Sequence, residues 1–405
     1  MTRRAALFTV AVFLITAAAI WFLLRPRVTP PPAAPALRLS ATQFTDLPGW
    51  KTSDAAAALA AFRLSCGALA KKPASENMGG VGYAGTVGDW VDACNELSSA
   101  KNARTFFETN FKVFTLAASG VQDGLFTGYY EPELRASRIR HDKYQTPVYG
   151  LPSNLVSVDL GKFRETLKGE QISGRLEGNR LVPFATRANI DRTGLSSAPV
   201  LFYAEDPVAV FFLHIQGSGR VLFDDGSKAR AAYAGKNGRP YTAIGRTLIA
   251  RGALTKDSVS MPTIRSWLKA HPDQAGAVMR SNESYTFFVL QPDAGQNASG
   301  SQGVPLTAAA SLAVDNRIHP LGVPLFLVTT LPGKPDGQAF RQLLIAQDTG
   351  GAIRGAVRGD VYWGTGARAE FLAGAMKSKG RFYVLLPNKV ATHLGGGKDF
   401  ALRTP

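Results

Sequence analysis

From Leu125 onward the chain is a succession of short apolar runs, each ended within a few residues by glycine or proline. Runs of roughly four to eight residues bounded by these two residue types are typical of β-strands, and many of them in succession are typical of sandwiches and barrels. Long helices cannot tolerate breaks at this frequency. The sequence therefore predicts a mainly β fold for this part of the chain.

The part before Leu125 has a different pattern. Residues 54–72 are alanine-rich and residues 89–113 are amphipathic, so both are predicted to be helices. Asp54 and Asp89 stand at their starts, where a short carboxylate side chain can cap free backbone N–H groups. Two further helices, inside the β-rich part, are predicted at 241–251 and 260–270.

Residues 5–24 form an uncharged and almost entirely apolar stretch. As a helix rising ~1.5 Å per residue it spans ~30 Å, the thickness of a bilayer's hydrocarbon core. A cleaved signal peptide is the competing interpretation, but its apolar region is usually ~7–15 residues long. The nearest small-residue cleavage site, Ala34-Pro-Ala36, is distant and contains a proline. We expect a transmembrane anchor over residues 1–27, followed by a proline-rich linker over 28–50.

The net charge is +16. A nucleic-acid-binding protein is one class with such a charge. The basic residues are scattered, however, without a dense run or a nucleic-acid motif, so no nucleic-acid partner is expected. The five histidines are dispersed and no phosphate-binding glycine motif occurs, so neither a metal nor a cofactor is predicted.

The chain has two cysteines, Cys66 and Cys94. One pair in an exported chain suggests a disulfide between neighbouring helices. Two small buried thiols are the alternative.

Two carboxylates mark the segment 345–364. Asp348 follows the apolar run Leu343–Ala346, and Asp360 comes after several glycines. Asp315 likewise follows an apolar run. Carboxylates on glycine-rich turns at strand ends are displayed toward a cleft, because loops carry function on a rigid scaffold. The alternative is that these aspartates only cap turns.

The segments that contain these aspartates resemble the C-terminal 3D region, named for three aspartates, of the membrane-bound lytic murein transglycosylase A (MltA) family. Further segments match upstream in the family's order. They are Phe126-Thr-Gly-Tyr-Tyr-Glu-Pro-Glu133, Phe212-Leu-His-Ile-Gln-Gly-Ser-Gly219, Tyr241-Thr-Ala-Ile-Gly245, Asn282-Glu-Ser-Tyr-Thr-Phe-Phe288 and Gly303-Val-Pro-Leu306. Each is weak alone, but the ordered series is specific and covers roughly residues 120–390.

The resemblance implies an architecture. A double-psi β-barrel would be built from both chain ends, residues 51–129 with their helices and residues 291–395. A second, smaller β-barrel domain would be inserted over 130–290. Between the two domains the family has a deep groove that binds glycan.

The resemblance also implies a reaction. MltA-type enzymes cleave the β-1,4 bond between N-acetylmuramic acid and N-acetylglucosamine, and the muramyl C6 hydroxyl closes onto C1 to give a 1,6-anhydro sugar. A single residue can then act first as acid and afterwards as base, and the family assigns that role to Asp360. An ordinary aspartate has a pKa of ~3.9, so this role requires a raised pKa. Burial beside Tyr362 and Trp363, with another carboxylate nearby, would raise it.

Two carboxylates are expected to support this residue. Asp348 either raises the pKa of Asp360 or shapes the turn, and both interpretations stay open. Asp315 is expected to be mainly structural, because Arg317 can pair with it. Residues implied to bind the glycan are Thr127, Tyr129, Tyr130, Gln216, Ser218 and Trp363. The alternative is an ordinary turn for Gln216 to Ser218, and a place in the core for the aromatic residues.

Two other functions remain open. One is a glycoside hydrolase that uses Asp360 together with Asp348 or Glu131, since hydrolases usually need two carboxylates. The other is a scaffold that binds peptidoglycan without turning it over. The leading expectation is a lytic transglycosylase that works without a cofactor on peptidoglycan glycan strands. It would be held in the inner membrane by its N-terminal helix, with its catalytic part in the periplasm, in contact with cell-wall synthesis or division complexes.

Overall fold

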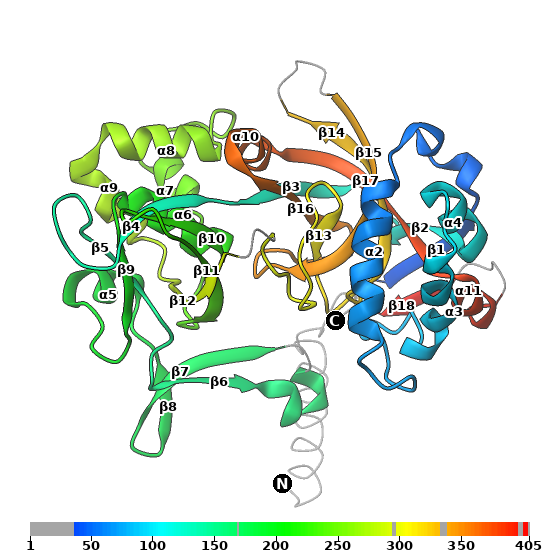
Figure 1. Ribbon diagram of the computed structural model, residues 1–405, viewed down its shortest axis with the longest axis horizontal. Coiled ribbons are helices and arrows are strands. Elements are labelled where there is room, and N and C mark those ends of the chain that lie inside the picture. Colours follow the sequence, from blue (N-terminus) through cyan, green and yellow to red (C-terminus); the bar gives the residue numbers. More distant parts are fainter. Residues whose placement is uncertain (1–35, 168–169, 294–296, 333–337, 396–399, 404–405) are drawn as a thin grey trace, which may run out of the picture. The chain divides into compact units, whose positions relative to one another are not determined.

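The computed structural model describes residues 36–167, 170–293, 297–332, 338–395 and 400–403 (Figure 1). The anchor predicted over residues 1–27 lies outside the described residues. Among the described helices, none is long and apolar enough to cross a membrane. The linker predicted over 28–50 was drawn too long, because Ala36–Thr42 already pair as a strand with Phe111–Ala118.

The larger sheet has nine strands and combines segments from both ends of the described chain (Figure 1). Its strands are β1 (Ala36–Thr42), β2 (Phe111–Ala118), β3 (Gly124–Glu131), β13 (Ser311–Val314), β14 (Pro324–Leu331), β15 (Gln338–Thr349), β16 (Arg358–Thr365), β17 (Lys377–Pro387) and β18 (Phe400–Arg403). The order is β14-β15-β13-β16-β3-β17-β2-β1-β18, and β14 also pairs with β17. That additional pairing closes six strands into a ring, so this part of the sheet is a barrel.

Apolar side chains from the barrel and from the N-terminal helices form one core. Four consecutive residues at the start of β14 are buried, because the strand lies inside the barrel wall and is covered on both faces. Bulky aromatic residues fill the space between the barrel and the helices. Among those fully buried are Trp50, Phe62, Trp90 and Phe111.

The helices before β2 are shorter than predicted. They are α2 (Ala56–Leu69), α3 (Val91–Asn95) and α4 (Ala103–Asn110). The single helix expected over 89–113 is therefore wrong: the chain breaks between α3 and α4, and Phe111 already begins β2. Asp89 is not an N-cap either. It lies three residues after the cap residue Thr86, and its carboxylate accepts from the Thr86 backbone N–H at 2.9 Å.

A disulfide joins two of these helices. Cys66 of α2 and Cys94 of α3 are bonded, with their Cα atoms 5.6 Å apart. Both cysteines adjoin the aromatic core. The bond therefore crosslinks the part of the chain that has little regular strand structure.

Nine strands that lie between β3 and β13 in sequence form two separate sheets. The six-stranded sheet, in the order β12-β11-β10-β4-β9-β5, contains β4 (Glu133–Ser137), β5 (Thr146–Tyr149), β9 (Val200–Ala204), β10 (Gly219–Phe223), β11 (Lys228–Lys236) and β12 (Thr286–Pro292). A bridge between Gly150 and Phe288 brings its two edges together, which makes the sheet barrel-like. The three-stranded sheet contains β6 (Leu155–Asp159), β7 (Gln171–Glu177) and β8 (Arg180–Pro183).

Seven further helices follow β8 in the described part of the sequence. Five of them precede β12, and two lie among the last strands of the barrel sheet. The seven are α5 (Arg187–Thr193), α6 (Pro207–Gln216), α7 (Ile244–Ala250), α8 (Met261–Ala270), α9 (Pro272–Met279), α10 (Gly366–Ala375) and α11 (Asn388–His393). The sequence predicted α7 and α8. Ser260 caps α8 as expected, and its side chain accepts from the Thr263 backbone N–H. Helix α6 begins at Asp206 and Pro207 and ends where Gly217 adopts a left-handed conformation, φ +83°.

A buried ion-pair network holds the two points where the chain passes between the sheets. Glu131, the last residue of β3, accepts from Arg230 of β11 at 2.6 Å, and its side chain is fully buried. Asp293, just after β12, lies 3.7 Å from the same guanidinium. Since β3 leads into the six-stranded sheet and β12 leads out of it, the network fixes both connections at one place.

Candidate active site

Asp360 lies in the barrel wall, on the third residue of β16. This strand runs parallel to β3, and the register pairs Asp360 with Thr127 and Tyr362 with Tyr129. Because side chains alternate between the two faces of a strand, these four residues share one face. The sequence placed Asp360 and Asp348 on turns, and this is wrong: Asp360 lies within β16 and Asp348 within β15.

Two polar side chains contact or flank the Asp360 carboxylate. The Thr127 hydroxyl donates to Asp360 Oδ1 at 2.6 Å. Arg358, two residues earlier on the same strand, donates to Thr127 Oγ1 at 2.9 Å and to the Gly359 carbonyl at 2.6 Å. The guanidinium therefore orients the threonine hydroxyl toward the carboxylate.

The pKa of Asp360 is raised above the ordinary value of aspartate. Burial is the largest cause, and the negative charge of Asp348 acts in the same direction. The hydrogen bond from Thr127 and the positive charge of Arg358 oppose the shift without cancelling it. Asp360 can therefore hold a proton at a higher pH than an ordinary aspartate and still has partners that stabilise its ionised form.

Asp348 is held by several donors. Its Oδ2 accepts from the Tyr129 hydroxyl at 2.7 Å. Its Oδ1 accepts from the Ser301 backbone N–H at 2.9 Å, from the Ser301 hydroxyl at 2.8 Å and from the Thr349 backbone N–H at 2.8 Å. The carboxylate thus fixes the segment around Ser301 as well as acting electrostatically on Asp360, so both interpretations of Asp348 have contacts in their support.

Asp315 does not support Asp360. It is buried, and its two oxygens accept from Arg317 Nε at 2.9 Å and Nη2 at 2.8 Å, and from the Gly355 backbone N–H at 2.9 Å. Burial alone would raise the pKa of Asp315, but these hydrogen bonds and the charge of Arg317 lower it. Asp315 anchors the loop before β16, as its expected pairing with Arg317 indicated.

Tyr130 and Trp363 lie on the face of the sheet opposite to Asp360. Both pack against α10, in a cluster with Ala369 and Ala373. Gly128 leaves the space that Trp363 occupies, since a Cβ at residue 128 would lie 2.3 Å from the indole Nε1. The assignment of these two aromatic residues to the glycan-binding face is therefore not supported by their positions. Their alternative, a place in the core, fits better.

Gln216 and Ser218 lie at the junction of α6 and β10. The Gln216 side-chain oxygen accepts from the Tyr130 backbone N–H at 3.2 Å, which ties the end of α6 to the end of β3. Both residues are half-buried. Of the six expected substrate-binding residues, Thr127 and Tyr129 lie on the same face of the sheet as Asp360. Both belong to β3, the strand that pairs with β16.

Three residues that interact with Asp360 or Asp348 escaped the sequence analysis as site candidates: Arg358, Ser301 and Tyr241. Arg358 could have been found from its two-residue spacing to Asp360, which places both on one strand face. Tyr241 begins a segment that the sequence analysis used as a family match and as the start of a predicted helix. Burial, opposed by the charge of Arg246 and assisted by the charge of Asp360, raises the pKa of Tyr241. The residue is nevertheless 49% exposed.

Other titratable candidates are occupied elsewhere. Glu131, the proposed partner in a hydrolase, is fully buried and paired with Arg230. His319 is buried too, with its ring nitrogens 2.8 Å from the Tyr83 hydroxyl and 2.7 Å from the Ala356 carbonyl. Over the described ranges no three histidine, cysteine or acidic residues gather as metal ligands.

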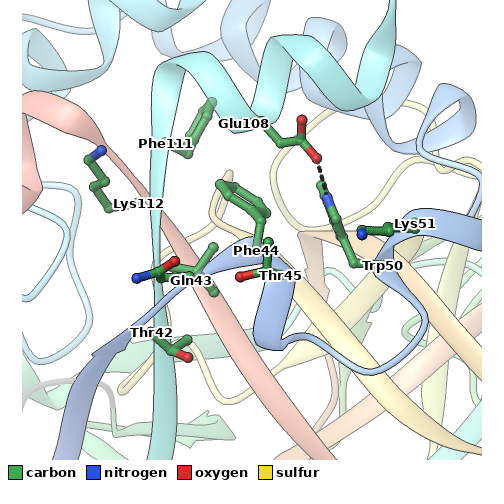
Figure 2. A pocket seen from close by; sticks show the side chains of 10 residues that line it. Thr42, Gln43, Phe44, Thr45, Trp50, Lys51, Glu108, Phe111 and Lys112 are labelled. Carbon is green, nitrogen blue, oxygen red and sulfur yellow. Dashed lines mark hydrogen bonds between the residues drawn. The ribbon is translucent and has the colours of Figure 1, made fainter.

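Two hollows lie away from Asp360. One, of about 620 Å³, is lined by residues from the segment after β1 and from α4 and β2, among them Phe44, Lys51 and Lys112. Figure 2 shows that its wall is held by a hydrogen bond from the Trp50 indole to Glu108, at 2.7 Å. The other, of about 860 Å³, is lined by residues between 140 and 285 and includes the buried Arg187. Neither hollow is lined by Asp360.

Known families match the two parts of the chain separately. Residues 125–289 match the MltA specific insert domain, and residues 310–386 match the 3D domain. Membrane-bound lytic murein transglycosylase A of Escherichia coli strain K12 is 35% identical over 265 residues. The matched region spans 64% of this chain and 65% of that relative.

Solved structures share the fold over more of the chain. A membrane-bound lytic murein transglycosylase from Agrobacterium tumefaciens is 34% identical, with a TM-score of 0.77 over 88% of this chain and 99% of that one. Escherichia coli MltA with bound chitohexaose is 28% identical, with a TM-score of 0.63 over 81% of this chain and 90% of that one.

Proposed function

The chain belongs to the membrane-bound lytic murein transglycosylase A family, and we propose that it cleaves peptidoglycan glycan strands at the bond from N-acetylmuramic acid to N-acetylglucosamine. The product is a 1,6-anhydromuramyl end, and Asp360 is the single acid and base. The observation that carries this proposal is the Asp360 carboxyl group itself. Its pKa is raised by burial, and it lies on the same face as Thr127 and Tyr129.

The first step breaks the bond between muramyl C1 and the leaving oxygen. Protonated Asp360 transfers its proton to that oxygen, which departs as the N-acetylglucosamine hydroxyl. Positive charge then develops at C1 and the ring oxygen. The ionised Asp360 that remains is stabilised by the Thr127 hydrogen bond and by the nearby Arg358 guanidinium.

The second step closes the anhydro ring. Ionised Asp360 takes the proton of the muramyl C6 hydroxyl while that oxygen bonds to C1. Asp360 ends the cycle protonated, so no water is consumed and no second catalytic carboxylate is required. Asp348 contributes by its negative charge, which favours the protonated state to which Asp360 must return.

We propose that the glycan binds in a groove between the barrel and the six-stranded sheet, the inserted domain of residues 130–290. In this proposal Thr127 and Tyr129 line the groove from the barrel, and Tyr241, a half-exposed residue of the inserted part, lines it from the other side. Aromatic rings and hydroxyl groups are the usual partners of sugars. That Escherichia coli MltA binds chitohexaose supports a glycan as the ligand. The family's double-psi arrangement is likewise proposed for the six-stranded ring of the larger sheet.

We also propose that residues 1–27 anchor the chain in the inner membrane and leave the catalytic part in the periplasm. The uncharged stretch 5–24 and the membrane-bound character named in its relatives support this. The mass of the protein extracted from membranes tests it. The full-length mass is expected, and loss of about the first 36 residues would contradict an uncleaved anchor.

Product analysis tests the reaction itself. Purified sacculi digested with the protein should yield muropeptides that end in 1,6-anhydromuramic acid, each one water lighter than its reducing counterpart. Reducing ends would instead indicate a two-carboxylate hydrolase. Binding without any released product would indicate a scaffold.

A further inference from the structure

Lys236 is the last residue of β11, a strand of the six-stranded sheet. The next residue, Asn237, is buried and fixes the backbone there. Its side-chain nitrogen donates to the carbonyls of Ala185 and Glu283, both at 2.9 Å. Its side-chain oxygen accepts from the Tyr285 backbone N–H at 2.9 Å. The lysine therefore starts from a rigid position.

The ammonium group of Lys236 reaches the barrel. Its Nζ lies 3.8 Å from the position that a Cβ on Gly351 would take. Gly351 belongs to the turn that follows β15, three residues after Asp348. A cation from the six-stranded sheet thus stands beside the turn that extends from the strand of Asp348.

No acidic side chain pairs with Lys236 in the part of the chain that the structure describes. The side chain is half-buried, and burial lowers the pKa of Lys236. The ring centroid of Tyr233 lies 5.9 Å from Nζ. Partial burial of a cation without an anion is unfavourable, and an anion supplied by a ligand would offset that cost.

The proposed substrate carries such an anion at one place only. The sugars of a murein strand are uncharged, and carboxylates occur on the substituent attached through the lactyl group of N-acetylmuramic acid. In intact murein the lactyl carboxyl is itself in amide linkage, so the free carboxylates belong to the peptide. A chitin oligosaccharide has neither a lactyl group nor a peptide.

We propose that Lys236 binds a carboxylate of the peptide attached to the muramyl residue in the groove, and so distinguishes murein from uncharged glycan. This inference rests on the proposed function, since it assumes that a murein strand passes Asp360. The compact ammonium group of a lysine donates to carboxylate oxygens in several directions, which suits a mobile peptide. The expected consequence is tighter binding of peptide-bearing strands.

Binding measurements in an Asp360→Asn background, which prevents turnover, test this. Three ligands are compared by calorimetry: chitohexaose, a murein tetrasaccharide with free lactyl groups, and the same tetrasaccharide with its peptides. Lys236→Met should weaken the peptide-bearing ligand by about tenfold and leave chitohexaose unchanged. Lys236→Arg should retain most of the affinity. Weakening of the free-lactyl ligand alone would overturn the peptide assignment.

Lys228→Met is the matched control, because Lys228 lies at the other end of β11 and is exposed. It should bind all three ligands like the parent. Equal loss for chitohexaose and for the peptide-bearing ligand, or no loss for either, would overturn the proposal. Thermal unfolding of each variant shows whether it is folded. Failure of the proposed function would show differently, as an absence of anhydro products from the wild type whatever Lys236 binds.

Discussion

Thr127 Oγ1 lies 2.6 Å from Asp360 Oδ1, although 233 residues separate the two in the sequence. Parallel pairing of β3 with β16 brings them together. The threonine hydroxyl donates a hydrogen bond to Oδ1, so we expect the proton of the neutral carboxyl group to be on Oδ2. In the proposed mechanism Oδ1 is fixed by Thr127 and Oδ2 exchanges the proton with the sugar.

Asp348→Asn should lower the pKa of Asp360, because it removes a nearby negative charge. An acid catalyst must be protonated, so activity is lost as the pH rises through the pKa of Asp360. The alkaline limb of the kcat/KM profile should accordingly move to lower pH. Asp315→Asn is the control, since Asp315 does not act on Asp360, and its profile should match the wild type. An unmoved limb in Asp348→Asn would refute the electrostatic role.

Arg358→Gln should have the opposite effect. The guanidinium lowers the pKa of Asp360, so its loss raises that pKa and moves the alkaline limb to higher pH. Arg358→Lys keeps the charge and should shift the limb less. A shift to lower pH in Arg358→Gln would contradict the assigned sign.

The sequence predicted the mainly β class, and it assigned the acid and base role to Asp360, an assignment that stays a prediction. It did so because the ordered motifs, and not any single one, carried the information. The helices at α7 and α8 were also found from local signals such as Ser260 and Gly252. These signals act within a few residues, so they can be recognised without knowledge of tertiary contacts.

The predictions that were wrong concern residues whose positions depend on strand pairing. Asp348 and Asp360 were placed on turns, because the glycines between them look like the end of a strand, whereas β15 extends to Thr349. Trp363 was assigned to the glycan although it is on the other face from Asp360, a distinction that needs the strand bounds and register. The approach of Lys236 to the turn at Gly351 brings together segments far apart in the sequence, and no local pattern predicts it.

Asp315→Asn should lower the free energy of unfolding at neutral pH by about 2 kcal/mol, because it removes the buried carboxylate that accepts from Arg317 and from the Gly355 backbone N–H. The pKa of Asp315 is lowered in the folded protein. Its contribution is therefore fully present above the ordinary pKa of aspartate and is lost as the pH falls through the lowered value. Denaturant unfolding at several pH values checks this. A difference between variant and wild type that persists undiminished in strong acid would argue against the ion pair.

Replacing both Cys66 and Cys94 by alanine should lower the free energy of unfolding by about 2–4 kcal/mol, since the disulfide limits the unfolded chain. Neither cysteine adjoins Asp360, so the turnover of folded molecules should stay at the wild-type level. Thermal unfolding and product release, measured on the same sample, separate the two effects. Loss of turnover in fully folded protein would show that the crosslink also positions the site.

The rate at which sacculi are converted to anhydromuropeptides by Asp360→Asn, measured by mass spectrometry against the wild type, tests the central claim. Asparagine keeps the shape of the aspartate side chain, and its amide oxygen can still accept a hydrogen bond from Thr127. It can neither donate a proton to the leaving oxygen nor take one from the C6 hydroxyl. The rate should fall by roughly 10³-fold while thermal unfolding is unchanged. Anhydro products at a rate within about tenfold of the wild type would contradict a single aspartate that acts as both acid and base.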